Sequence, residues 1–142
     1  SLMDLNENCL DLVESKLVSK SVTKCQVDIL KNIDKDLYDT YDSVAFNYLI
    51  HCLPDNGTKN VVFENAAKLV KQDGIVFGST IINDYSNSLA VKVVNKFNEN
   101  GIFDNSNDTK ERIESYIKAN FNTYSLEQIG SVCVFTMSDP IR

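Results

Sequence analysis

The sequence predicts an α/β domain with a mainly parallel β-sheet, helices on both faces and a C-terminal antiparallel hairpin. Apolar runs alternate with segments of helical periodicity, one run is apolar on successive residues, and the last two runs are separated only by Gly130 and Ser131. Alternating strands and helices form parallel sheets, because a connection between parallel strands has to cross over the sheet. Two residues cannot cross over, so the last two strands must be antiparallel.

The first half of the chain is expected to contain one helix and three strands. Asn6 can cap a helix over residues 7–20, because its side-chain oxygen can accept from a backbone N–H of the first turn. The third strand is apolar on successive residues from Val44 to Phe46, which is typical of a parallel strand covered on both faces. The expected strands cover residues 1–5, 24–30 and 42–49.

The second half is expected to continue the alternation and to end in the hairpin. Gly74 is expected to stop a helix over residues 58–72, because glycine readily adopts the backbone conformation that ends helices. Asp108 and Glu111 have the spacing of a capping box, which predicts the start of another helix. The remaining elements are a strand over residues 74–82, a helix over residues 86–100, and hairpin strands over residues 123–129 and 131–137.

Length and composition indicate one domain over residues 1–142. Hydrophobic residues make up 43% of the chain and charged residues 24%, and the formal net charge is −6. Nucleic acid is not an expected partner, because phosphate binding needs a concentrated basic patch and the sequence has none. No apolar run approaches the roughly 20 residues of a membrane span, so no membrane is expected. Four scattered cysteines favour free thiols in the cytoplasm and offer no metal site.

Polar side chains follow the expected strands, at the edge where ligands bind in an open parallel sheet. Asp4 and Asn6 follow the first strand, and Asp28 follows the second. An acidic residue at a strand end can accept both hydroxyls of a ribose. The alternative for Asp4 and Asn6 is helix capping alone, and the alternative for Asp28 is an ordinary turn. Further polar residues follow the later strands, at positions 47–51 and 79–83.

His51 is the only histidine of the chain. With an unperturbed pKa of about 6.5 it could act as a general base. No nucleophile elbow and no second histidine accompany it, so a hydrogen-bonding role within the fold is the alternative interpretation. The glycines form neither G-x-G-x-x-G nor a P-loop, which argues against a nucleotide-binding domain of another kind.

These segments resemble the class I S-adenosylmethionine-dependent methyltransferases, in particular those acting on small molecules. One strand and its exit read DSVAFNYLIHCLP, and the next strand reads GIVFGSTII. MDLN and VDIL are similar to the ends of the family's second and third strands, and the resemblance covers nearly all of the chain. It implies a Rossmann-like fold, S-adenosylmethionine as cofactor and a small-molecule methyl acceptor as partner.

The resemblance also implies roles for the matching residues around the cofactor's nucleoside. Asp4 would hold the ribose hydroxyls, Leu5 would pack on the adenine, and Asn6 would assist beside them. Asp28 would meet the adenine amino group, and Ile29 would supply a backbone N–H to the ring.

At the other end of the cofactor, Asn47 and Tyr48 would lie under the methionine and sulfonium part. His51 would stand nearer the acceptor as the catalytic candidate. By resemblance, a first central strand with a glycine-rich turn belongs before Ser1, between the strands that end at Asp4 and Asn47. The domain is therefore expected to be N-terminally incomplete and to bind the cofactor weakly or not at all. Four explanations remain open: an omitted segment, a truncated chain, a strand supplied by a second chain, and a sheet that closes up with different neighbours.

Two functional hypotheses follow. The first is methyl transfer from S-adenosylmethionine to a small molecule, which needs orientation more than a strong nucleophile. The second is a non-catalytic α/β module, in which exposed sheet edges pair with another copy to form a homo-oligomer.

Overall fold

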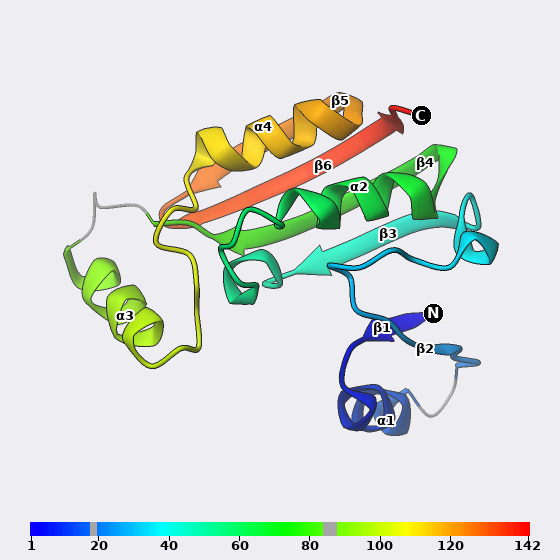
Figure 1. Ribbon diagram of the computed structural model, residues 1–142, viewed down its shortest axis with the longest axis horizontal. Helices are drawn as coiled ribbons and strands as arrows, with labels where there is room; N and C mark the ends of the chain where they lie inside the picture. Colours follow the sequence, from blue (N-terminus) through cyan, green and yellow to red (C-terminus); the bar gives the residue numbers. More distant parts are fainter. Residues whose placement is uncertain (18–19, 84–87) are drawn as a thin grey trace.

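A computed structural model of the protein describes residues 1–17, 20–83 and 88–142. Figure 1 shows a larger layered body, in which the helices α2 and α4 lie over a sheet, and a smaller unit that contains the N-terminus. The smaller unit consists of β1 (Leu2–Asp4), α1 (Glu7–Lys16) and β2 (Lys24–Gln26). The rest contains the short 3₁₀ helices η1 (Lys35–Leu37) and η2 (Ile50–Cys52), the strands β3 (Tyr41–Asn47), β4 (Val70–Ile81), β5 (Phe121–Ile129) and β6 (Val132–Pro140), and the helices α2 (Asn60–Leu69), α3 (Ser88–Glu99) and α4 (Lys110–Asn120).

The strands form two sheets. β1 and β2 make a parallel pair, and the larger sheet has the order β3-β4-β6-β5. β3 is parallel to β4, whereas β6 is antiparallel to both β4 and β5. The expected C-terminal hairpin is therefore confirmed, and its second strand is inserted beside β4 rather than at the edge of the sheet.

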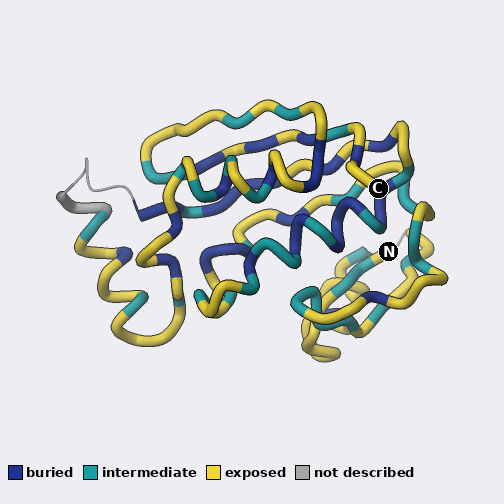
Figure 2. Tube along the Cα trace, turned by 45° about the horizontal axis from the view of Figure 1, so that its top comes forward, coloured by how far each residue is buried: buried dark blue, intermediate teal, exposed yellow. Residues whose placement is uncertain are grey.

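The core lies between the larger sheet and the helices α2 and α4, which cover the same face (Figure 1). The ring of Phe46 on β3 lies 5.5 Å from that of Phe63 on α2 and 5.4 Å from that of Phe135 on β6. Figure 2 shows buried positions along α2 and the inner strands, while α1 is largely exposed. On the opposite face of the sheet Ile75, Phe77 and Val134 are 40–44% exposed, as expected from the alternation of side chains along a strand.

The facing edges of the two sheets are separated by a cavity. In the described part of the chain, β1 pairs only with β2, and β3 pairs only with β4. Between β1 and β3 lies an apolar cavity of about 110 Å³, lined by Met3 of β1, Val44 of β3 and Leu69 of α2 among others. The expectation of a further strand at this place stays a prediction.

Two expectations about helix ends are wrong. α2 ends at Leu69 and β4 begins at the next residue, so Gly74 lies inside the strand and stops no helix. A Cβ at Gly74 would stand 2.8 Å from the carbonyl oxygen of Asp42, so the glycine allows close backbone approach between β4 and the start of β3. The second strand is also shorter than expected and ends at Gln26.

α4 is capped by Thr109, whose Oγ1 accepts from the backbone N–H of Arg112 at 3.2 Å. The capping box of Asp108 and Glu111 is therefore wrong, and the Asp108 carboxylate is directed elsewhere. Asn6 does cap α1, as its Oδ1 accepts from the backbone N–H of Asn8 at 3.0 Å. Positions 18–19 and 86–87 of the expected helices lie outside the described residues.

Candidate functional site

The carboxyl ends of β1 and β3 point the same way, so the residues that follow them lie toward one side of the molecule (Figure 1). After β1, Asp4 Oδ1 accepts from the backbone N–H of Asn6 at 2.7 Å, and Leu5 is 63% exposed. This turn serves capping and at the same time presents a carboxylate beside an exposed apolar side chain. The two interpretations of Asp4 and Asn6 are thus compatible.

Asp28 and Ile29 follow β2 in a tight turn. Asp28 Oδ1 accepts from the backbone N–H of Leu30 at 3.1 Å, which gives it the role of a turn residue. The carbonyl of Ile29 accepts from Asn65 Nδ2 at 2.8 Å, and the same amide donates to the carbonyl of Lys31. Asn65 on α2 therefore fixes this turn against the larger body.

The exit of β3 is held in an unusual backbone conformation. Tyr48 has a φ of 55°, in the left-handed region that side-chain-bearing residues rarely occupy, and it is 55% exposed. Its backbone N–H donates to the carbonyl of Ser79 at 2.7 Å, and Ser79 Oγ donates to Asn47 Oδ1 at 3.2 Å. Strained positions of this kind concentrate at functional sites, because the fold must supply energy to keep them.

His51 is buried beneath this exit. Its Nδ1 lies 3.3 Å from Thr80 Oγ1 and accepts from the backbone N–H of Ile81 at 3.3 Å. Burial, together with the charge of Lys59, lowers the pKa of His51 from 6.5 to about 4. The ring is therefore neutral at pH 7 and carries its proton on Nε2, since Nδ1 is an acceptor. It packs edge-on against Phe103, with the ring centroids 4.5 Å apart.

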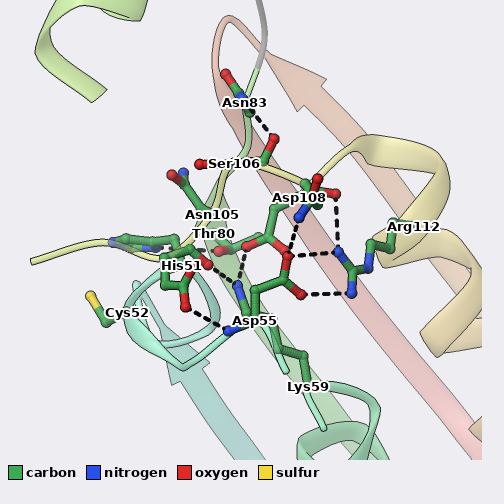
Figure 3. A network of polar contacts seen from close by, with 12 residues as sticks. His51, Cys52, Asp55, Lys59, Thr80, Asn83, Asn105, Ser106, Asp108 and Arg112 are labelled. Carbon is green, nitrogen blue, oxygen red and sulfur yellow. Dashed lines mark hydrogen bonds and ion pairs between the residues drawn. The ribbon is translucent and has the colours of Figure 1, made fainter. Parts of the chain in front are cut away.

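A buried network of charged side chains lies next to His51 (Figure 3). Lys59 Nζ donates to Asp108 Oδ2 at 2.7 Å, and neither side chain is exposed to solvent. Burial raises the pKa of the Asp108 carboxyl, while the hydrogen bond from Lys59 opposes this shift. Asp55 forms a two-point ion pair with Arg112, with bonds of 2.7 and 3.0 Å.

The sequence pattern did not indicate this network. Lys59 and Asp108 are separated by 49 positions, and each lies just before a helix, where a local interpretation as a capping or surface residue suffices. A nearby polar pocket of about 460 Å³ was not anticipated either. It lies between the turn after β3 and the segment after α3, and its lining residues are Cys52, Pro54, Asn98, Gly101, Phe103, Asp104 and Ser106.

In the described part of the chain, no helix is both long and apolar enough to cross a membrane. No family profile matches the chain. The uncharacterized protein YbcY of Escherichia coli (strain K12) is 34% identical over 142 residues, an alignment that covers 97% of this chain and 73% of YbcY. The physcion biosynthesis cluster O-methyltransferase of Aspergillus chevalieri is 29% identical, over 99% of this chain and 64% of that enzyme.

Among solved structures, the chain is similar to the N-methyltransferase NodS from Bradyrhizobium japonicum WM9, determined in complex with S-adenosyl-L-homocysteine. The TM-score is 0.68 at 11% identity, over 98% of this chain and 65% of NodS. This likeness confirms the expected Rossmann-like fold. The methyltransferase relatives in sequence show that the chain belongs to the family of class I S-adenosylmethionine-dependent methyltransferases.

Proposed function

We propose that the protein transfers a methyl group from S-adenosylmethionine to a small-molecule acceptor. The observation that carries this proposal is the exit of β3, where the strained Tyr48 and its bond to Ser79 turn the chain away from the sheet. In a member of this family, such a turn at the carboxyl end of a strand is suited to a bound ligand. The chain spans 73% of YbcY and 64% of the Aspergillus enzyme, so the proposal concerns the part of the domain present in this chain.

The residues after β1 and β2 are proposed to hold the nucleoside of the cofactor. The exposed carboxylate of Asp4 can accept hydrogen bonds from the ribose diol, and the exposed Leu5 offers an apolar surface to the adenine. Asn6 fixes the turn that presents them. Asp28 and the backbone N–H of Ile29 are proposed to meet the edge of the adenine.

The residues after β3 are proposed to face the methionine part and the acceptor. The cofactor, when bound, supplies an electrophilic methyl group, so the protein needs to align the acceptor and exclude water. Asn47 and Tyr48 can provide polar contacts at this end. His51 carries its proton on Nε2, so its proposed role is to donate a hydrogen bond that orients the acceptor.

A calorimetric titration with S-adenosyl-L-homocysteine tests the proposal. Measurable binding is expected, because the exposed carboxylate of Asp4 and the exposed side chain of Leu5 can both contact the nucleoside. Asp4→Asn keeps the bond to the Asn6 backbone but removes the charge, and we expect it to weaken binding by about tenfold or more, since hydrogen bonds to charged groups contribute about 1.5–3 kcal/mol.

Asp34→Asn is the matched control, because Asp34 makes the same kind of bond to the residue two positions on, with Asp36. Equal losses in both variants would contradict the role of Asp4. The complete absence of binding at millimolar ligand would contradict the proposed function of this chain.

A second candidate function is a module that binds another copy of itself. The observation in its favour is the pair of facing strand edges on β1 and β3, with an apolar cavity between them. Exposed strand edges are ready to pair with another chain. Such a module would associate with another copy without binding S-adenosyl-L-homocysteine. Sedimentation and calorimetric titration of the same protein therefore distinguish the two functions.

A further inference from the structure

The segment Phe103–Thr109, called the strap below, runs from α3 to α4 past the carboxyl ends of β3 and β4 (Figure 1). It forms backbone hydrogen bonds with the residues that follow β3 and with those that follow β4. The backbone N–H of Asp104 donates to the carbonyl of His51 at 2.8 Å, and the backbone N–H of Asn83 donates to the carbonyl of Asp108 at 2.7 Å. The strap is therefore fixed by backbone hydrogen bonds to this edge of the sheet.

A single ammonium group joins the two ends of the strap. Lys59 Nζ donates to the carbonyl of Asp104 at 2.6 Å and to the carboxylate of Asp108 at 2.7 Å, with no exposure to solvent (Figure 3). The other carboxylate oxygen, Asp108 Oδ1, is buried and has no hydrogen-bond partner among the residues that the structure describes. Lys59 is thus the group that compensates the buried charge of Asp108.

The outer side of the strap is held by Asp55. Its backbone N–H donates to Asp104 Oδ2 at 2.8 Å, and its carboxylate accepts from Asn107 Nδ2 at 2.6 Å. The same carboxylate forms the two-point pair with Arg112 on α4. The turn before α2 and the first turn of α4 therefore clamp the strap from two directions.

The strap carries Phe103, which contacts His51, and it contributes residues to the pocket beside His51. Phe103 packs edge-on against the His51 ring, and Phe103, Asp104 and Ser106 form one wall of the pocket of about 460 Å³. A buried ion pair is a poor source of stability compared with apolar side chains of the same volume. In some proteins such a pair instead selects one defined arrangement of the groups around it.

We propose that Lys59 and Asp108 are positioning residues, which through the strap fix Phe103 against His51 and hold the acceptor-side wall of the site. The assignment of this wall to the acceptor rests on the proposed function. The position of His51 itself does not, because it is a property of the fold and can be measured without any ligand.

The test compares Lys59→Met/Asp108→Leu, which replaces the ion pair by apolar side chains, with the unaltered protein. Lys68→Met is the matched control, because Lys68 lies at the far end of α2 in a partly exposed ion pair with Glu64. His51 is the only histidine, so its ring signals in NMR spectra are assigned without ambiguity. Hydrogen exchange of the Asp104 and Asn83 amides reports on the strap.

We expect the double variant still to unfold cooperatively. The chemical shifts of the His51 ring protons should change as Phe103 moves. The rate of hydrogen exchange at the Asp104 and Asn83 amides should rise at least tenfold. Lys68→Met should leave all three unchanged. Unaltered His51 shifts and amide exchange in a folded double variant would overturn the proposal. If that variant does not fold, Asp108→Asn is measured in the same way, with the same two outcomes.

Titration with S-adenosyl-L-homocysteine separates this proposal from the proposed function. We expect the double variant to bind within about twofold of the unaltered protein, because Asp4 and Leu5 lie at the end of β1 in the other sheet. A loss of affinity that accompanies loosening of the strap would overturn the acceptor-side assignment. If the unaltered chain binds none, the proposed function fails, and the His51 and exchange measurements still decide whether Lys59 and Asp108 position the ring.

Discussion

His51 shows how burial changes the chemistry of one side chain. In water an imidazole gains a proton near pH 6.5, but in this fold its pKa is lowered to about 4, first by burial and then by the charge of Lys59. An acceptor nitrogen bonded to the backbone N–H of Ile81 is also poorly placed to receive a proton. The histidine that the sequence offers as a general base is thereby better suited to donate a hydrogen bond.

The lowered pKa predicts a pH dependence of stability. Between pH 6.5 and about 4 the unfolded chain binds a proton at His51 and the native state does not. Stability from this residue is therefore fully present above pH 6.5 and falls as the pH drops toward 4, by at most about 1.4 kcal/mol per pH unit. Urea unfolding of the unaltered protein and of His51→Gln between pH 5 and 7 measures how the free energy of unfolding changes with pH. An equal change with pH in both proteins would contradict the prediction.

Residue types at strand ends could be read from the sequence, whereas their partners could not. Asp4 and Asn6 stand at the end of a strand and just before a helix. Helix capping and ligand binding can therefore both be predicted from the local sequence. The buried pair of Lys59 and Asp108 depends on a contact across 49 positions, which no local periodicity encodes. The capping box predicted for Asp108 is wrong because its spacing to Glu111 matches that motif by coincidence.

At the scale of elements, the connections decide what can be predicted. Two residues between the last strands force a hairpin, and the structure confirms it. Gly74 is expected at a helix end because a glycine after an amphipathic run usually marks one. The sequence does not distinguish that case from close approach between strands, and here the carbonyl of Asp42 lies where a Cβ would stand.

The pairing of β3, β4 and β6 predicts that replacing Gly78 by a residue with a side chain lowers the stability of the protein. A Cβ at Gly78 would collide with the carbonyl oxygen of Phe46 and stand 2.8 Å from the ring of Phe135. We expect Gly78→Ala to lower the free energy of unfolding by about 1–3 kcal/mol, measured by urea denaturation. Gly101→Asn is the control, because a Cβ at Gly101 would meet no atom within 4 Å and asparagine tolerates its φ of 66°. Equal losses in both variants would show that close packing at Gly78 has no cost.

At the scale of the whole molecule, the facing edges of β1 and β3 predict self-association. An uncovered strand edge exposes backbone donors and acceptors, and the nearby face exposes Ile75 and Phe77. We expect sedimentation to show a concentration-dependent oligomer. Ser43→Lys on β3 should shift the protein toward the monomer, because a charge on an edge strand opposes pairing. Sedimentation of the unaltered chain as a strict monomer at every concentration would contradict the prediction.

The insertion of β6 between β4 and β5 also has a consequence for synthesis on the ribosome. Domains generally begin to fold from the N-terminal side as they emerge. β4 here cannot complete its pairing until β6 has been made, because Ile75 pairs with Ser138 and Val76 with Met137. While residues 82–131 are being made, one side of β4 is left without its partner. The nascent chain therefore passes through a stage in which a chaperone would have a strand to shield, and that stage ends only when the hairpin closes.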